Sequence, residues 1–426
     1  PVLVFTFVST WMFYSRIFCC PTFVIEVFQV VTYCTRPCLD IGFSTKSSLE
    51  KGHHIPVFVT KIYIETTYKS YSSINDNDLA VIPVIHPKLQ LSEQWRVSLG
   101  VTDGARLQPV LYGGVIAVLS GDKRLLLLDA ASGAERRRIN LPTPVAGGAG
   151  LGEELIAIGT LKGELLAYGY DGKLRWRVRV GSEVIAPPTV TDSLVLVRGT
   201  DGRLTAHSAT DGAIKWVYAR QQPALQLRNF SAPVVEGGVV YYGQAGGRLA
   251  ALSLKEGRVL WEAQVAQPRG VSEIERMADV VASPVVYGDM VCAVAYQGRL
   301  ACFNAKNGSL GWSREISSYS GLAVDDKAVY VTDDKGNLIA YERASGRNLW
   351  RQDKLALRGV SGPAVDGNTL VVGDYQGFLH FIDTEDGSFV AQRKTDGGAI
   401  ETAPQPTGGR WLIQTQKGGL SALTGK

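Results

Sequence analysis

A short block of residues recurs along the chain, and this repetition constrains the fold more than any other feature. The copies read GELLAYGYDGKLRW, GRLTAHSATDGAIKW, GRLAALSLKEGRVLW, GRLACFNAKNGSLGW and GNLIAYERASGRNLW, with weaker copies RLLLLDAASGAERR and GFLHFIDTEDGSFVA. Each copy holds an alternating apolar strand, a turn that ends in glycine, and a second strand that usually carries a tryptophan. Asp-Gly and Asn-Gly pairs at the turn supply the positive φ that a tight hairpin requires. The sequence therefore predicts tandem hairpins of one kind.

The spacing of the blocks predicts a propeller. Their turn glycines lie 39, 40, 45, 51, 38 and 41 residues apart. Two more strands precede each block, as in SAPVVEGGVVYYGQ, and four strands per unit is the composition of a propeller blade. The tryptophans share one repeat position, so we expect each ring to pack between neighbouring blades. The glycines are Gly133, Gly172, Gly212, Gly257, Gly308, Gly346 and Gly387, and the tryptophans are Trp176, Trp216, Trp261, Trp312 and Trp350.

An eighth blade is divided between distant parts of the chain. The C-terminal stretch KGGLSALTGK supplies the first strand of a block, and EQWRVSLG near Ser92 has the pattern of an isolated tryptophan strand. Joining them closes the ring and removes the exposed edges of an open array. We predict an all-β, eight-bladed β-propeller of four-stranded antiparallel blades over residues 92–426. The strand of Trp95 should pair with the strand around Leu420 to Leu423.

Residues 1–91 carry no copy of the repeat and form an unassigned N-terminal extension. The first fifteen residues are uncharged, but Arg16 and Glu26 leave the apolar stretch shorter than a membrane helix needs. A basic start and a small-residue cleavage site, the marks of a signal peptide, are missing. Three interpretations remain: a degenerate export or anchor segment, an extra β-rich element, or sequence foreign to the natural mature protein. The abrupt change in composition favours the last.

Charge and cysteine usage exclude some functions. A net charge of +4, from 44 basic and 40 acidic residues, is too dilute for a nucleic-acid partner. Cys292 and Cys302 lie in apolar strands, where buried free thiols and a bridge within one blade are both compatible with the pattern. The front cysteines lack CxxC spacing, which argues against a zinc site; they are Cys19, Cys20, Cys34 and Cys38, with His53 and His54 nearby.

Two of the repeat intervals are longer than the others. The extra residues follow Trp216 and Trp261, so both insertions lengthen a connection from the outer strand of one blade to the inner strand of the next. Equivalent connections emerge on one face of a propeller. Apolar residues beside an arginine and carboxylates predict an interaction patch there. The candidate residues are Leu225, Leu227 and Arg228 in the first connection, and Ile274, Glu275, Arg276, Met277 and Asp279 in the second.

The block resembles the repeat of pyrroloquinoline-quinone enzymes, which implies a quinone-dependent oxidoreductase as one hypothesis. Those enzymes hold calcium in the central channel through Glu, Asn and Asp, and place a vicinal disulfide beside the quinone. The vicinal pair Cys19–Cys20 lies outside the predicted propeller, and the blades show no added acidic cluster. His207 and His380 fall in alternating strands and are interpreted as structural, because an isolated histidine lacks an orienting partner. We therefore expect no catalysis, no cofactor and no metal.

A more specific resemblance covers residues 92–426. The stretches PALQLRNFSAPVV, VSEIERMADVVASPVV, AYQGRLACFNAKNG and LVVGDYQGFLHFIDTEDGSFVAQRK resemble those of the BamB family, the propeller lipoproteins of the bacterial β-barrel assembly machinery. The resemblance implies a non-enzymatic scaffold at the periplasmic face of the outer membrane. It would bind the periplasmic domains of BamA within the BAM complex and assist the insertion of outer-membrane proteins.

The resemblance also implies roles for individual residues. In the family, contact with BamA runs through a Leu-x-Leu-Arg loop, matched by Leu225, Leu227 and Arg228, and through acidic residues of the next loop. Asp279 matches one acidic position, whereas Val281 replaces the other. The family's lipid anchor has no counterpart motif in this chain. Exposed strand edges would offer β-augmentation to unfolded client strands, and a carbohydrate- or peptide-binding propeller is the third hypothesis.

Overall fold

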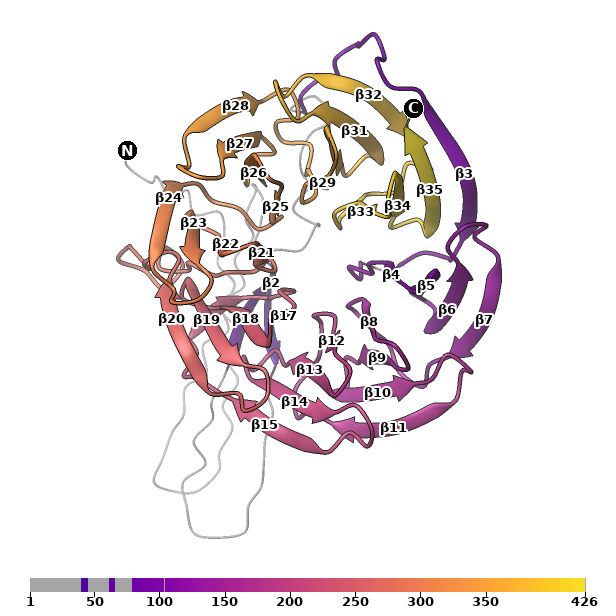
Figure 1. Cartoon of the computed structure of the whole chain (residues 1–426), viewed down its shortest axis with the longest axis vertical. Helices are drawn as coiled ribbons and strands as arrows, with labels where there is room; N and C mark the ends of the chain where they lie inside the picture. Colours follow the sequence, from indigo (N-terminus) through magenta and orange to yellow (C-terminus); the bar gives the residue numbers. More distant parts are fainter. Residues whose placement is uncertain (1–39, 45–60, 66–78, 103, 426) are drawn as a thin grey trace, which may run out of the picture.

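Eight four-stranded antiparallel sheets form a closed ring around a central opening (Figure 1). The computed structural model describes residues 40–44, 61–65, 79–102 and 104–425. In each blade the strands follow one another from the centre of the ring to its rim, which confirms the predicted all-β, eight-bladed propeller. In the described part of the chain, no helical segment has the length and hydrophobicity needed to cross a lipid bilayer.

The first four blades take their strands in chain order, and the connections between successive blades differ in length. Blade 1 is β4 (Val110–Tyr112), β5 (Val115–Ser120), β6 (Arg124–Asp129) and β7 (Glu135–Asn140), and blade 2 is β8 (Ala149–Leu151), β9 (Ile156–Gly159), β10 (Glu164–Tyr168) and β11 (Leu174–Arg179). Blade 3 is β12 (Thr189–Val190), β13 (Leu194–Arg198), β14 (Leu204–Ser208) and β15 (Ile214–Tyr218), and blade 4 is β17 (Val234–Glu236), β18 (Val239–Gln244), β19 (Arg248–Ser253) and β20 (Val259–Gln264).

The last four blades complete the ring. Blade 5 is β21 (Val285–Tyr287), β22 (Met290–Val294), β23 (Arg299–Asn304) and β24 (Leu310–Glu315), and blade 6 is β25 (Leu322–Val324), β26 (Ala328–Thr332), β27 (Leu338–Glu342) and β28 (Asn348–Gln352). Blade 7 is β29 (Ala364–Asp366), β30 (Thr369–Gly373), β31 (Phe378–Asp383) and β32 (Phe389–Lys394), and blade 8 is β33 (Gln405–Pro406), β34 (Arg410–Gln414), β35 (Gly419–Gly425) and β3 (Leu91–Ser98).

Blade 8 closes the ring by joining the two predicted parts. Strand β3 pairs antiparallel with β35, and Trp95 lies opposite Ala422 while Val97 lies opposite Leu420. The predicted closure is therefore confirmed. Since β3 is the outer strand of this blade, the ring depends on hydrogen bonds between segments more than 300 residues apart in the sequence.

The repeated tryptophans join each blade to the next. The indole N–H of Trp261 in blade 4 donates to the carbonyl of Ala305 in blade 5 at 3.0 Å, and its ring covers the turn glycine Gly308. That glycine has a φ of 71°, and a Cβ there would lie 2.6 Å from the indole. Only glycine fits both constraints. Packing between blades is confirmed at all six such rings, which belong to Trp95, Trp176, Trp216, Trp261, Trp312 and Trp350.

Two blades carry another residue at the tryptophan position. Blade 1 has Arg137, whose side chain lies under Gly172 of blade 2. Blade 7 has Ala391 in this position of β32, and Leu89 supplies the missing apolar group from outside the repeat. A Cβ added to Gly425 would lie 2.7 Å from the Leu89 side chain. The junction of blades 7 and 8 is therefore completed by the chain that precedes β3.

Residues 79–90, here called the strap, are held against blades 6 and 7. The Arg358 guanidinium donates to the Ala80 carbonyl at 3.1 Å and forms a buried ion pair with Asp374 at 2.6 Å. Burial alone would raise the pKa of Asp374, but the His380 hydrogen bond and the charges of His380 and Arg358 lower it below its usual value. The strap, which precedes the predicted boundary at Ser92, is thus in contact with the blades.

The blade-5 cysteines settle one open alternative. Cys292 and Cys302 lie directly opposite each other on β22 and β23 and form a disulfide within the blade. Both are buried. The candidate zinc residues Cys19, Cys20, Cys34, Cys38, His53 and His54 lie outside the described residues.

Candidate docking surface and channel mouth

The two long connections emerge on the same face of the ring. Because the strands of a blade are antiparallel, successive connections alternate between the two faces, and every outer-to-inner connection emerges on one of them. The connection after β15 contains an extra strand, β16 (Leu225–Leu227), outside the blades. Strand β16 pairs in parallel with β2 (Lys61–Glu65), which pairs with β1 (Asp40–Ser44). The first long connection is thus built as the edge of a small sheet.

A buried carboxylate fastens the two connections together. Asp279, 1% exposed, accepts hydrogen bonds from the backbone N–H of Leu227 at 2.7 Å and of Gly246 at 2.8 Å. Burial raises the pKa of Asp279, while these two bonds and the charge of Arg198 offset part of the rise. A second tie runs from the Asn229 side-chain amide to the Val280 carbonyl at 2.7 Å. The two connections are therefore joined into one surface by hydrogen bonds.

Several predicted contact residues lie beneath this surface. Leu227, Met277 and Val281 are buried together in a small apolar cluster, with Leu225 half-buried at its edge. In this structure the side chains of Leu227, Met277 and Asp279 are buried and support the loops from within. A loop has no regular side-chain periodicity, so its sequence does not show which side chains point inward. The packing of the second connection on the first determines which side chains are buried.

The second connection exposes a tight turn at residues 271–276. The Glu275 carboxylate accepts hydrogen bonds from the N–H groups of Val271 at 2.8 Å and Ser272 at 3.1 Å, and these bonds lower the pKa of Glu275. Arg276 pairs with Glu273 on the outside of the turn. Ile274 is 46% exposed and Val271 is 92% exposed. Arg228 is half-buried on the first connection.

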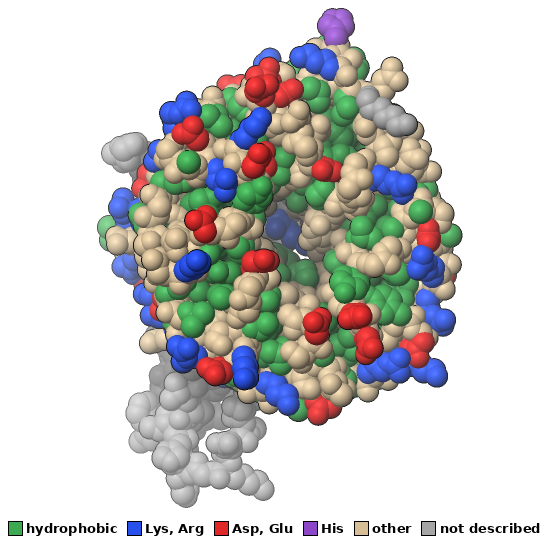
Figure 2. All heavy atoms as spheres, in the orientation of Figure 1, with side chains coloured by type: hydrophobic (Ala, Val, Ile, Leu, Met, Phe, Trp, Pro, Cys, Tyr) green, Lys and Arg blue, Asp and Glu red, His purple; other side chains and the backbone are tan. Residues whose placement is uncertain are grey.

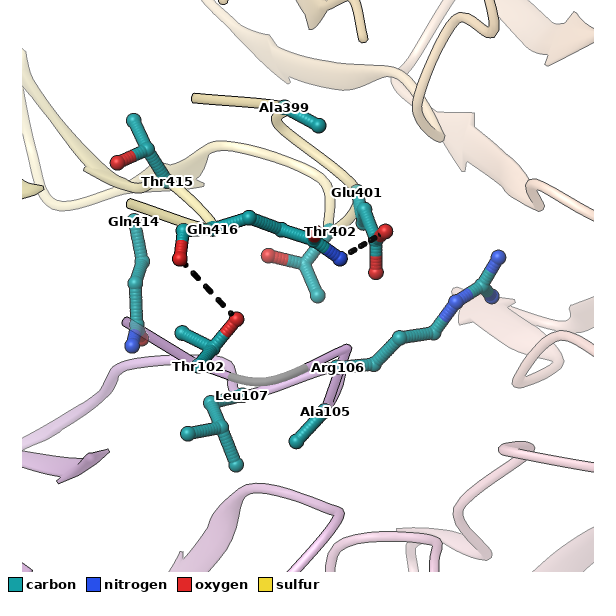
Figure 3. Close-up of a pocket in the computed structure, with 10 residues that line it drawn as sticks. All are labelled: Thr102, Ala105, Arg106, Leu107, Ala399, Glu401, Thr402, Gln414, Thr415 and Gln416. Carbon is teal, nitrogen blue, oxygen red and sulfur yellow. Dashed lines mark hydrogen bonds between the residues drawn. The ribbon is translucent and has the colours of Figure 1, made fainter. Parts of the chain in front are cut away.

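The same family of connections lines the mouth of the central channel. Seven of them surround a cavity of about 210 Å³, and Figure 2 shows the central opening of the ring. The Arg106 guanidinium lies 5.0 Å from the centre of the Phe230 ring. Glu401 accepts a hydrogen bond from the Gln416 amide, and Figure 3 shows the Arg106 side chain extending from the opposite loop. Burial raises the pKa of Glu401, and the charge of Arg106 and the Gln416 bond offset part of that rise.

The channel mouth was not among the sites predicted from the sequence. Phe230 follows Arg228 by two residues, and Arg106 and Glu401 each precede the inner strand of a blade. This shared position in the repeat was the one sequence signal that could have indicated the site. Only the closed ring shows that these residues of blades 1, 4 and 8 face one cavity.

The histidines and the acidic groups of the blades bear on the quinone hypothesis. His207 and His380 are fully buried, and their ring nitrogens contact Thr205 and Gly212, and Asp374 and Gln392, respectively. Both rings are therefore hydrogen-bonded within the fold, and the Asp374 carboxylate beside His380 is a partner that the sequence pattern did not indicate. Within the described ranges, three or more His, Cys, Asp or Glu side chains do not come together in a way that would hold a metal ion.

The closed ring and its loop-built face define the class of this protein, an eight-bladed propeller with a specialised connection face. Solved structures agree. Quinohemoprotein alcohol dehydrogenase from Comamonas testosteroni aligns with a TM-score of 0.64 and 13% identity over 78% of this chain and 76% of that chain, a likeness of fold alone. BamB from Moraxella catarrhalis aligns with a TM-score of 0.73 and 26% identity over 79% of this chain and all of that chain.

The chain belongs to the BamB family. The family model described as "Outer membrane protein assembly factor BamB" matches residues 137–352 and 334–426. The protein of that name from Burkholderia pseudomallei is 38% identical over 78% of this chain and 88% of its own length. The one from Nitrosomonas eutropha is 37% identical over 90% of this chain and 91% of its own length, a larger share of this chain than the propeller occupies.

Proposed function

We propose that this chain is a non-enzymatic scaffold subunit of the machinery that assembles outer-membrane β-barrel proteins. Its relatives carry the name of outer membrane protein assembly factors. In this proposal the chain works at the periplasmic face of the outer membrane, within the BAM complex, and binds the periplasmic domains of BamA. One observation carries the docking proposal: the two longest connections are fastened by Asp279 into one surface beside Arg228.

The geometry suits binding by a preorganised surface. Loops that are already ordered lose little conformational entropy when a partner binds, so more of the contact energy appears as affinity. Asp279 and Asn229 hold the connections in place, and the apolar cluster of Leu227, Met277 and Val281 supports them from below. Arg228 and the exposed Ile274 then supply the arginine and apolar contacts that dominate many interfaces.

Titration calorimetry of the full chain against the isolated periplasmic domains of BamA tests this proposal. We expect saturable binding that Ile274→Asp weakens and that Ile214→Asp, on the rim strand β15, leaves within twofold of wild type. The two isoleucines are similarly exposed, at 46% and 59%. Absence of binding, or equal losses at both positions, would contradict docking through the connection face.

The fold's likeness to quinohemoprotein dehydrogenases motivates a separate test of the non-enzymatic part. The chain is incubated with pyrroloquinoline quinone and calcium, and dye-linked alcohol oxidation is followed. We expect no turnover above the quinone alone. Turnover that Glu401→Gln abolishes would favour an oxidoreductase.

A further inference from the structure

We propose that the channel mouth is a second pocket of the docking surface and receives an aromatic side chain of the docked partner. This inference rests on the proposed function and extends it from a flat loop contact to a contact with an anchor. The pocket is the cavity of about 210 Å³ beside Phe230, Arg106 and Glu401.

The cavity and the docking loops form one continuous surface. Val281 and Tyr319 line the cavity and also belong to the apolar cluster under β16 and the second connection. The rings of Tyr319 and Tyr296 lie 6.4 Å apart within that cluster. A partner seated on the long connections therefore lies next to the mouth of the channel, on the same face of the ring.

The first connection leads directly from the predicted contact residue to the cavity wall. Arg228 is followed by Asn229, whose side chain binds the Val280 carbonyl at 2.7 Å and accepts the Ser231 N–H at 2.8 Å. Phe230 lies between these two fixed points and forms part of the wall. Phe230 is thus two residues along the chain from Arg228, and the residues on both sides of Phe230 are held by hydrogen bonds.

The chemistry of the lining selects the occupant. Much of the wall is apolar, and its two charged residues, Arg106 and Glu401, carry opposite charges. Arg106 also covers one face of Phe230. A further charge would lose its hydration without gaining a partner, whereas an aromatic ring gains apolar contacts and edge contacts with Phe230. The apolar wall residues include Ile185, Pro187, Val281, Val285, Leu322 and Pro363.

The size of the pocket favours a side chain over a free ligand. Pockets for drug-sized molecules usually start at roughly 300 Å³, and this cavity is smaller. Aromatic residues that fill such pockets near the centre of an interface commonly contribute the most to affinity.

Photocrosslinking to the periplasmic domains of BamA tests the inference. A small alkyl-diazirine amino acid replaces Thr402 in the cavity wall, Ile274 on the docking loop, or Thr210 in the β14–β15 turn on the opposite face. We expect crosslinks from positions 402 and 274 and none from position 210. Crosslinks from position 274 without crosslinks from position 402 would contradict the pocket proposal and leave the docking proposal intact. Absence of crosslinks from both positions would contradict both proposals.

A filling substitution provides the second measurement. Thr402→Phe places a ring in the cavity and should weaken binding at least tenfold, whereas Thr210→Phe makes the same change on the other face and should stay within twofold. Circular dichroism and thermal unfolding confirm that each variant is folded. Wild-type affinity for a folded Thr402→Phe variant would show that the partner does not enter the pocket.

Discussion

The junctions between blades and the connection face are built in opposite ways. At six junctions an indole N–H donates to a carbonyl of the next blade, and the ring covers a turn glycine. On the connection face the ties occur once each, such as Asp279 to Leu227 and Asn229 to Val280. Features that every blade shares serve the task that every blade shares, which is to hold the ring. Features that depart from the repeat are where a single partner can be recognised.

Removal of the strap and β3 should have the largest effect on the ring. Deleting residues 1–98 removes the outer strand of blade 8 and Leu89 from the junction of blades 7 and 8. We expect this truncated chain to lose the cooperative unfolding transition near the wild-type melting temperature, and circular dichroism measures that transition. Deleting residues 1–78 keeps both elements and should leave the melting transition nearly unchanged. Equal melting of the two truncated chains would contradict the role given to closure.

The substitution of a single repeated tryptophan should have the next largest effect on stability. Trp261→Ala removes a buried ring and its bond to Ala305, and substitutions of this type cost about 3–5 kcal/mol. Urea unfolding measures the change. Arg137→Ala, at the equivalent position of blade 1, serves as the control and should cost much less, because the arginine on this exposed strand buries little apolar surface. Similar losses at both positions would show that the tryptophans have no special part in the junctions.

The anchor of the strap should respond to acid. The pKa of Asp374 is lower in the folded protein than its ordinary value of 3.8. Its contribution to stability is therefore complete above the unfolded pKa and is lost as the pH falls through the folded pKa. We expect limited proteolysis within residues 79–90 to accelerate below about pH 4. Asp374→Asn should show rapid cleavage already at neutral pH; a strap equally resistant in the variant would contradict this anchor.

Much of the ring was predictable from the sequence, and much of the connection face was not. The block repeats, so its period, its glycines and the pairing of Trp95 with the last strand followed from local patterns. The strap contains no repeat, and Leu89 acts by filling a space that exists only in the closed ring. Asp279 and Leu227 lie on loops without a repeat pattern, and a contact between the two loops buries both.

The smallest effect on stability, with a clear effect on binding, is expected at Asp279. Asp279→Asn keeps the shape but leaves one oxygen for two N–H donors, so β16 is held less firmly. We expect binding to the BamA periplasmic domains to weaken about tenfold, which corresponds to about 1.4 kcal/mol. Hydrogen exchange at the Leu227 amide should rise in the same variant. Weakened binding without faster exchange would indicate direct contact in place of positioning.

If the connection face, and not the repeated ring, binds the partner, one arginine on each surface should separate the two in a single titration. Arg228→Ala and Arg137→Ala are compared with the wild-type chain against the BamA periplasmic domains, with circular dichroism to confirm folding. We predict that Arg228→Ala loses about 2 kcal/mol or more of binding free energy, because truncation leaves partner groups unpaired, while Arg137→Ala stays within twofold of wild type. Wild-type binding by Arg228→Ala, or a comparable loss in Arg137→Ala, would contradict docking through the connection face.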